Sequence, residues 1–144
     1  MDIIDAPFIQ FGPEDIPRPW LPVVIKNPYT NQSVSLYGLI DTGADECAIP
    51  AQYAPIIGHN LQAGLQKKIS TGNGVTIAYA HSLTFETRGI TIENVLIDFM
   101  PNLNVVLLGV KSFLSNFKVI IDYKDNKFSL LDINFHHEGP AIKQ

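Results

Sequence analysis

The chain of 144 residues lacks several features that mark whole classes of protein. Its single cysteine, Cys47, cannot form an internal disulfide, which fits a reducing compartment. No apolar run approaches the roughly 20 residues needed to span a bilayer, and the first residues do not follow the pattern of a secretory signal. Lysine and arginine form no run, and the net charge is −4, which argues against a nucleic-acid or membrane-surface partner. We therefore expect a cytoplasmic protein that binds neither nucleic acid nor membrane.

Helical periodicity is also scarce. The chain instead contains short segments rich in Val, Ile, Leu, Phe and Tyr, separated by Gly, Pro, Asn and Asp. This pattern predicts an all-β domain. The hydrophobic content of 46% and the charged content of 17% suit a globular protein and not a disordered one. The expected strands cover residues 21–26, 33–40, 64–70, 75–86, 90–99, 105–108, 118–123 and 127–131.

Turns and short helices complete this prediction. Gly, Asn and Asp gather at residues 71–74 and 124–126, which predicts two hairpin tips. The strand over 75–86 begins with alternating Val, Ile and Tyr, so one of its faces is expected to be packed. A single helical turn is expected at residues 50–54. The apolar spacing of three and four over residues 111–117 predicts an amphipathic helix.

No internal repeat or low-complexity linker divides the chain, so residues 1–144 are expected to form one domain. Its core is predicted to cover about residues 21–131. Residues 1–20 contain four prolines and are interpreted as an N-terminal arm, and residues 132–144 as a C-terminal tail.

The most informative segment is LIDTGADECAI at residues 39–49, where an apolar strand ends abruptly at an acid. A carboxylate at the inner end of a buried strand is costly unless it is hydrogen-bonded or paired, so Asp41 requires an explanation. The tripeptide formed by Asp41, Thr42 and Gly43 is by itself also compatible with an ordinary turn, because Asp and Gly favour turns.

This segment resembles the active-site loop of the retropepsin-like aspartic proteases, whose pattern is two apolar residues, Asp-Thr-Gly-Ala and then acids. The resemblance continues in VLLG at residues 106–109, which matches the second landmark of that family. Altogether it covers roughly residues 21–131. It implies a small closed or partly open β-barrel of the acid-protease type with one or two short helices, and it implies that Asp41 is the catalytic acid.

The chain departs from the viral pattern at two places. Many viral members follow the second landmark with an arginine that pairs with the acid two residues after the motif glycine. Here that acid is Asp45, but Val110 and Lys111 follow the landmark, and lysine lacks the bidentate fork of arginine. The expected flap has only Gly72 and Gly74 instead of a glycine-rich run. The resemblance therefore points to cellular rather than viral members.

The chemistry that the resemblance implies needs two carboxylates that share one proton and activate a water, without metal or cofactor; aspartic proteases are the standard example of such a pair. The chain contains one Asp-Thr-Gly and no second Asp-Thr-Gly or Asp-Ser-Gly. The second acid must then come from another copy across a two-fold axis. We therefore expect a homodimeric endopeptidase that cleaves peptide or protein substrates.

The resemblance also implies roles for the neighbours of Asp41. Thr42 would hydrogen-bond to the partner loop, Gly43 would donate its N–H to the carboxylate, and Ala44 would leave room for substrate or partner. Asp45 would accept hydrogen bonds from the substrate main chain, or else it is a solvated loop acid. A flap tip over the bound peptide is the second expected binding element, with a plain hairpin turn as the alternative. Its residues are Thr71, Gly72, Asn73 and Gly74.

Other candidate sites are weaker. Cys47 is interpreted as a small buried hydrophobe and not as a nucleophile. The histidines show no metal-ligand spacing, so no metal site is expected. They are His59, His81, His136 and His137.

Two alternatives to an active homodimer stay open: a non-catalytic peptide-binding or assembly module that retains the fold, and a zymogen whose ends are removed by self-cleavage.

Overall fold

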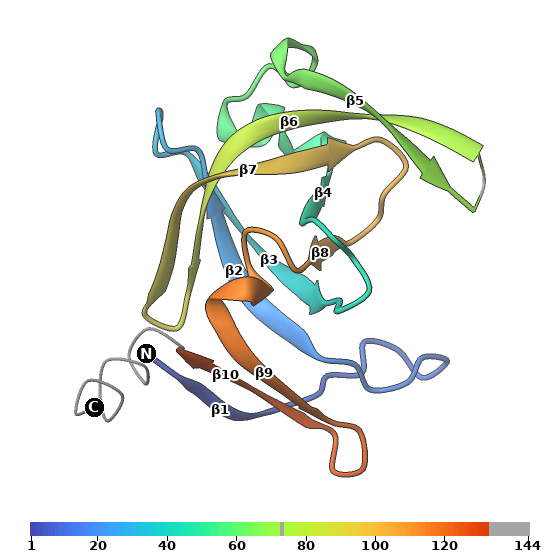
Figure 1. Ribbon diagram of the computed structural model, residues 1–144, viewed down its shortest axis with the longest axis vertical. Coiled ribbons are helices and arrows are strands. Elements are labelled where there is room, and N and C mark those ends of the chain that lie inside the picture. Colours follow the sequence, from blue (N-terminus) through green and yellow to red (C-terminus); the bar gives the residue numbers. More distant parts are fainter. Residues whose placement is uncertain (73, 133–144) are drawn as a thin grey trace, which may run out of the picture.

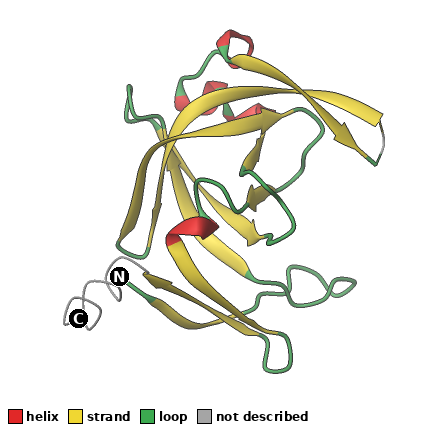
Figure 2. Ribbon diagram, viewed as in Figure 1, coloured by secondary structure: helices red, strands yellow, loops and turns green. Residues whose placement is uncertain are grey.

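The computed structural model describes residues 1–72 and 74–132, and within them it is built from strands and a few short 3-10 helices (Figures 1 and 2). The all-β prediction is confirmed. The strands are β1 Ile3–Pro7, β2 Trp20–Lys26, β3 Ser33–Ile40, β4 Ala48–Pro50, β5 Leu65–Thr71, β6 Gly74–Thr87, β7 Ile90–Met100, β8 Val106–Leu108, β9 Phe117–Asp122 and β10 Lys127–Asp132. The 3-10 helices are η1 Ala51–Tyr53, η2 Pro55–Ile57, η3 Leu61–Ala63 and η4 Leu114–Asn116.

The main sheet has seven strands in the order β2-β3-β8-β4-β7-β6-β5, and it closes on itself because the end strand β2 also pairs with β6, the neighbour of β5. Lys26 and Glu86 reinforce this closure with an ion pair of 2.7 Å between Nζ and Oε2. The sheet therefore forms a partly closed ring from which the β5–β6 hairpin projects (Figure 1). The interior is filled by large apolar side chains, including Leu21, Phe85 and Phe99.

A second sheet, in the order β1-β10-β9, corrects the interpretation of the first twenty residues as an arm. Ile3 and Ala6 of β1 are both buried in the core, so this part of the chain belongs to the folded body. The sequence pattern hides the strand because a bulge with Asp5 at φ 52° replaces strict alternation with a spacing of three. Pro7 ends β1, a position at a sheet edge where the missing N–H costs little.

The predicted amphipathic helix over residues 111–117 is wrong. Only η4 forms there, because Ser112 adopts a left-handed conformation with φ 72° that a helix cannot contain. Phe113, Leu114 and Phe117 are nevertheless buried, and the ring of Phe113 packs edge-on against Phe85 with centroids 5.6 Å apart. The apolar spacing therefore predicted correctly which of these residues are buried, but it predicted the wrong backbone conformation for them.

Both predicted hairpin tips are present, one between β5 and β6 and one between β9 and β10. In β6, however, the packed face is not the one that the alternation of Val and Ile indicates. Val75 is 68% exposed and Ile77 39%, whereas Ala78 and Ala80 on the opposite face are buried. Small side chains thus occupy the inner face of this strand.

The predicted tail lies almost entirely outside the described residues, apart from Asp132, which ends β10.

Candidate active site

The topology around Asp41 explains why the chain turns there. Strand β8 lies between β3 and β4, parallel to β3 and antiparallel to β4, so the segment that joins β3 to β4 must cross over the end of β8. Asp41 is the first residue after β3, and its backbone N–H donates to the carbonyl oxygen of Leu108 at 3.1 Å. We call residues 41–47 the active-site loop. Its start is fixed by a strand that lies far downstream in the sequence.

The carboxylate of Asp41 is held by its own loop. Oδ1 accepts a hydrogen bond of 3.0 Å from the N–H of Gly43, and the N–H of Ala44 donates to the carbonyl oxygen of Asp41 at 3.2 Å. Asp41 and Ala44 are partly buried, whereas Thr42 and Gly43 are exposed. Oδ1 of Asp41 is therefore oriented by the backbone of its own loop, and Thr42 and Gly43 at the turn of the loop remain accessible to another molecule.

The other side of the loop rests on Gly109, which sequence reasoning named only as part of a landmark. The N–H groups of Val110 and Lys111 donate to the carbonyl oxygens of Ala44 and Asp45, at 2.9 and 2.8 Å. Any Cβ at position 109 would lie 2.7 Å from the carbonyl oxygen of Ala44, closer than atoms can approach without a shift. The glycine is therefore required by the close approach of the two chain segments.

Cys47 at the end of the loop is a structural residue, in keeping with its interpretation as a buried hydrophobe. Its side chain is buried, and its Sγ accepts a hydrogen bond of 3.3 Å from the N–H of Gly109. Burial raises the pKa of the thiol to about 11, and the nearby carboxylates of Glu46 and Asp98 act in the same direction. A thiol with this pKa is a poor nucleophile at neutral pH.

Asp45 contacts Lys111 differently from the viral arrangement. The contact is the backbone hydrogen bond described above, and among the described residues the carboxylate of Asp45 takes part in no ion pair. Its side chain is exposed, which leaves its oxygens accessible to another molecule.

The predicted flap tip lies at the end of the β5–β6 hairpin, well separated from the active-site loop in Figure 1. Thr71 pairs with Gly74, which has φ 112°, and Gly72 and Gly74 are exposed. Asn73 and the side chain of Thr71 lie outside what the structure describes. The described part of this tip is therefore a hairpin turn.

A cluster of charges that the sequence did not reveal lies beside the loop. Nζ of Lys67 in β5 is 2.9 Å from Oδ1 of Asp98 in β7 and 3.1 Å from Oε2 of Glu46 in the active-site loop. Burial alone would lower the pKa of Lys67, but the hydrogen bonds and charges of these two carboxylates raise it above its usual value. We refer to these three residues as the Lys67 triad.

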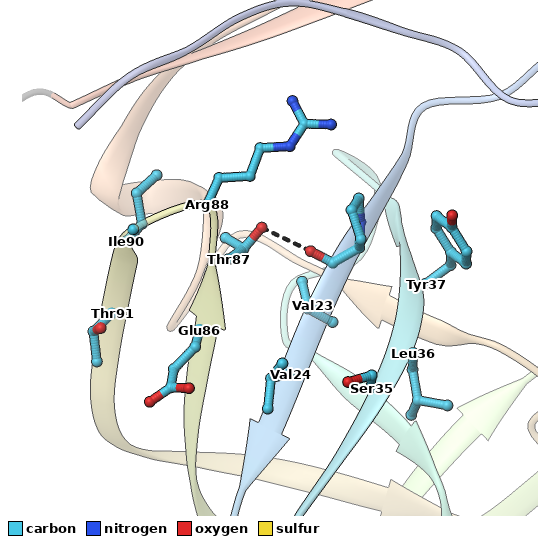
Figure 3. Close-up of a pocket in the computed structure, with 12 residues that line it drawn as sticks. Val23, Val24, Ser35, Leu36, Tyr37, Glu86, Thr87, Arg88, Ile90 and Thr91 are labelled. Carbon is cyan, nitrogen blue, oxygen red and sulfur yellow. Dashed lines mark hydrogen bonds between the residues drawn. The ribbon is translucent and has the colours of Figure 1, made fainter.

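A hollow of about 590 Å³ lies elsewhere, on the β2–β3 surface next to the β6–β7 turn. Its walls include Val24, Tyr37 and Arg88, and two further lining residues are joined by a hydrogen bond of 2.7 Å from Oγ1 of Thr87 to the carbonyl oxygen of Pro22 (Figure 3). None of its lining residues belongs to the active-site loop or the flap.

The rings of His59 and His81 pack against each other at a tilt of 33°, with centroids 4.5 Å apart. Nε2 of His59 donates to the backbone carbonyl of Ser82, and Nε2 of His81 donates to that of Leu61. Burial, and secondarily the neighbouring His81, lowers the pKa of His59, although the bond to Ser82 opposes this shift. The pair braces the segment that carries η3 against β6. His136 and His137 lie outside the described residues.

The comparisons with known proteins bear on this geometry directly. Residues 30–116, more than half of the chain, match the family described as "gag-polyprotein putative aspartyl protease". The matched segment includes both the active-site loop and the VLLG landmark. The chain belongs to the retropepsin-like aspartic protease family. No curated protein sequence matches this chain significantly.

Solved structures support the fold of this retropepsin-like chain. It is similar to a retropepsin-like aspartic protease from Rickettsia conorii, with 24% identity and a TM-score of 0.65 over 89% of this chain and 98% of the other. It is also similar to the retroviral protease-like domain of Ddi1 from Leishmania major, with 16% identity and a TM-score of 0.53 over 78% and 88%. Over residues 1–72 and 74–132, no helix has the length and apolar character needed to cross a bilayer.

Proposed function

We propose that this retropepsin-like chain is an aspartic endopeptidase that works as a homodimer, with Asp41 of each copy forming the catalytic pair. The observation that carries the proposal is the setting of Asp41: it follows β3, and its Oδ1 is oriented by the N–H of Gly43 within a loop anchored on Gly109. Such fixed hydrogen-bond donors hold a carboxylate in a defined orientation before substrate arrives. Membership of an aspartic protease family supports the same chemistry.

The reaction requires two carboxylates that share one proton, and one copy of the chain supplies one Asp-Thr-Gly. The ionised acid takes a proton from a water whose oxygen attacks the peptide carbonyl carbon. The protonated acid donates its proton to the carbonyl oxygen, which gives a neutral gem-diol. When the C–N bond breaks, the acid that took the proton of the water gives it to the leaving amine, and the other acid takes a proton from a hydroxyl of the gem-diol, so the pair again shares one proton.

The exposed part of the active-site loop supports the assignment of partner and substrate contacts. Thr42 and Gly43 are accessible, so the Thr42 hydroxyl is free to bond across a two-fold axis to the partner loop. The side chain of Ala44 leaves space for a close approach, and the accessible carboxylate of Asp45 suits the N–H groups of an extended peptide. The hairpin tip at residues 71–74 would close over this peptide.

The first experiment compares the wild type with Asp41→Asn in cleavage of denatured casein. Asp41→Asn should lose activity by at least about 1,000-fold, because an amide cannot exchange the proton. Its unfolding temperature should stay close to that of the wild type, since Oδ1 is retained. Asp125→Asn, the same change at the exposed β9–β10 hairpin tip, is the matched control and should keep full activity.

A subunit-mixing experiment tests whether the pair forms across a dimer. Wild type and Asp41→Asn are mixed in equal amounts and allowed to exchange subunits. The mixture should keep about a quarter of the activity of wild type at the same total protein concentration, because only wild-type pairs carry two acids. A retained activity of one half would mean that each chain acts alone and would contradict the proposal. A wild type that stays monomeric at high concentration and leaves casein intact would favour the binding or assembly module.

A further inference from the structure

The Lys67 triad connects three parts of the fold that the backbone pairing of the sheet joins only indirectly. Lys67 lies on β5, which among the described strands pairs with β6 alone; Asp98 lies on β7; and Glu46 belongs to the active-site loop. The two ion pairs to Nζ measure 2.9 Å to Asp98 and 3.1 Å to Glu46. A single side chain thus forms a direct link between the strand that leads to the flap and the loop that carries Asp41.

The sequence of β6 makes this link possible. Lys67 pairs with Ala78, and Ala80 pairs with Asp98, so all four side chains lie on the same face of the sheet. The two alanines are buried and short, which lets the lysine stem pass over β6 toward β7. Larger residues at these two positions would fill the path of the stem. The small inner face of β6 is therefore explained by the side chain that crosses it.

The burial of Asp98 makes the link strong. Asp98 is only 3% exposed, and a buried carboxylate without a cationic partner is strongly destabilising. Lys67 supplies that cation and keeps two donor protons for Glu46 and solvent. The N–H of Asp98 also donates to the carbonyl oxygen of Cys47 at 3.3 Å, so β7 holds the end of the active-site loop through its backbone as well.

We infer that Lys67 is a positioning residue for the proposed protease: by bridging Asp98 and Glu46 it fixes the active-site loop relative to the flap strand. The inference rests on the proposed function. It implies that a displacement of β5 when the hairpin moves is transmitted to Glu46, five residues after Asp41. The active-site loop therefore has the geometry required for catalysis only when β5 holds Lys67 against Glu46. Lys67 thus affects catalysis through the loop and does not touch the reacting atoms.

The test begins with three single variants. Lys67→Met keeps a stem of similar length and removes the charge, Lys67→Arg restores a cation, and Lys68→Met makes the same change at the next residue, which is exposed and points to the other face. We expect kcat of Lys67→Met to fall about 10- to 100-fold with a smaller change in KM, as for a small misplacement of a catalytic group. Lys67→Arg should recover most of this loss, and Lys68→Met should match the wild type.

A double variant separates positioning from stability. Lys67→Met leaves Asp98 buried and unpaired and should lower the unfolding temperature, whereas Lys67→Met with Asp98→Asn removes both charges and should recover it. Positioning predicts that kcat of the double variant stays low although its stability returns. A double variant whose stability and kcat both return to the wild-type values would overturn the inference, because the triad would then serve the fold alone.

Hydrogen exchange supplies a readout that needs no cleavage. Amides of residues 41–47 should exchange faster in Lys67→Met and in the double variant than in the wild type or Lys68→Met. If the wild type cleaves nothing, the proposed function fails, and the exchange rates still decide whether Lys67 orders the loop. Exchange rates that are equal in all four proteins would refute the role of Lys67 whatever the activity.

Discussion

The replacement Gly109→Ala tests most directly how the active-site loop is held. A Cβ at this position would meet the carbonyl group of Glu46, 2.6 Å from its carbon, and would lie 2.7 Å from the carbonyl oxygen of Ala44. These are backbone atoms, so relief requires that the loop and the segment after β8 move apart. That movement would stretch the hydrogen bonds from Val110 to Ala44 and from Lys111 to Asp45.

The expected cost follows from these contacts. Overpacking costs about 1–3 kcal/mol, and a weakened hydrogen bond adds about 1 kcal/mol, so we expect a loss of about 2–4 kcal/mol in the free energy of unfolding. For a chain of this size that corresponds to a fall of about 10 °C in the unfolding temperature. Activity should fall by about 100-fold or more even where the protein remains folded, because Asp41 moves with its loop.

Differential scanning fluorimetry and casein cleavage, on the same preparations, measure the two effects. Gly12→Ala is the matched control, because a Cβ at position 12 would have no atom within 4 Å, and this variant should behave as the wild type. If Gly109→Ala unfolds at the wild-type temperature and cleaves at the wild-type rate, the loop does not depend on the close approach at Gly109, and this explanation of the site is wrong.

Two further predictions concern groups whose pKa values are shifted. Since the pKa of Cys47 is raised to about 11, iodoacetamide at neutral pH should alkylate the folded protein about 100-fold more slowly than the denatured one; equal rates would show that the thiol is accessible. The pKa of His59 is lowered by burial, so its contribution to stability is present above the unfolded value of about 6.5 and is lost as the pH falls through the folded pKa. Unfolding temperatures measured across this range should therefore fall less steeply in His59→Gln than in the wild type, and parallel curves would contradict this assignment.

Much of the main sheet could be predicted from the sequence, because its strands are apolar segments bounded by turn residues. The strand expected at residues 33–40 coincides with β3, and the hairpin tips at 71–74 and 124–126 are where they were expected. Strand β1 was not predicted because a bulge interrupts its alternation of buried and exposed residues. The helix predicted over residues 111–117 was wrong because the same apolar spacing also occurs where a chain turns sharply and buries its apolar side chains in the core.

The site was predictable only where its residues are close together in the sequence. Asp41 and its neighbours form a local motif, and Gly109 appeared through the second landmark. Lys67 and Asp98 could not be found from the sequence, since their contact depends on the register of β5, β6 and β7, and no local pattern distinguishes the buried Asp98 from an acid on the surface. Only the structure shows that the side chain of Lys67 crosses β6, because Ala78 and Ala80 lie between Lys67 and Asp98.

The insertion of β8 between β3 and β4 has a consequence for the order in which the protein matures. Asp41 and the strands on both sides of it are synthesised early, but the partners that shape their connection, Leu108 and Gly109, belong to the last part of the sheet to emerge. Pairings this distant form late and slowly in folding. Until β8 has been synthesised, the loop of Asp41 therefore lacks these backbone partners, and in the proposed protease this would delay self-cleavage during synthesis.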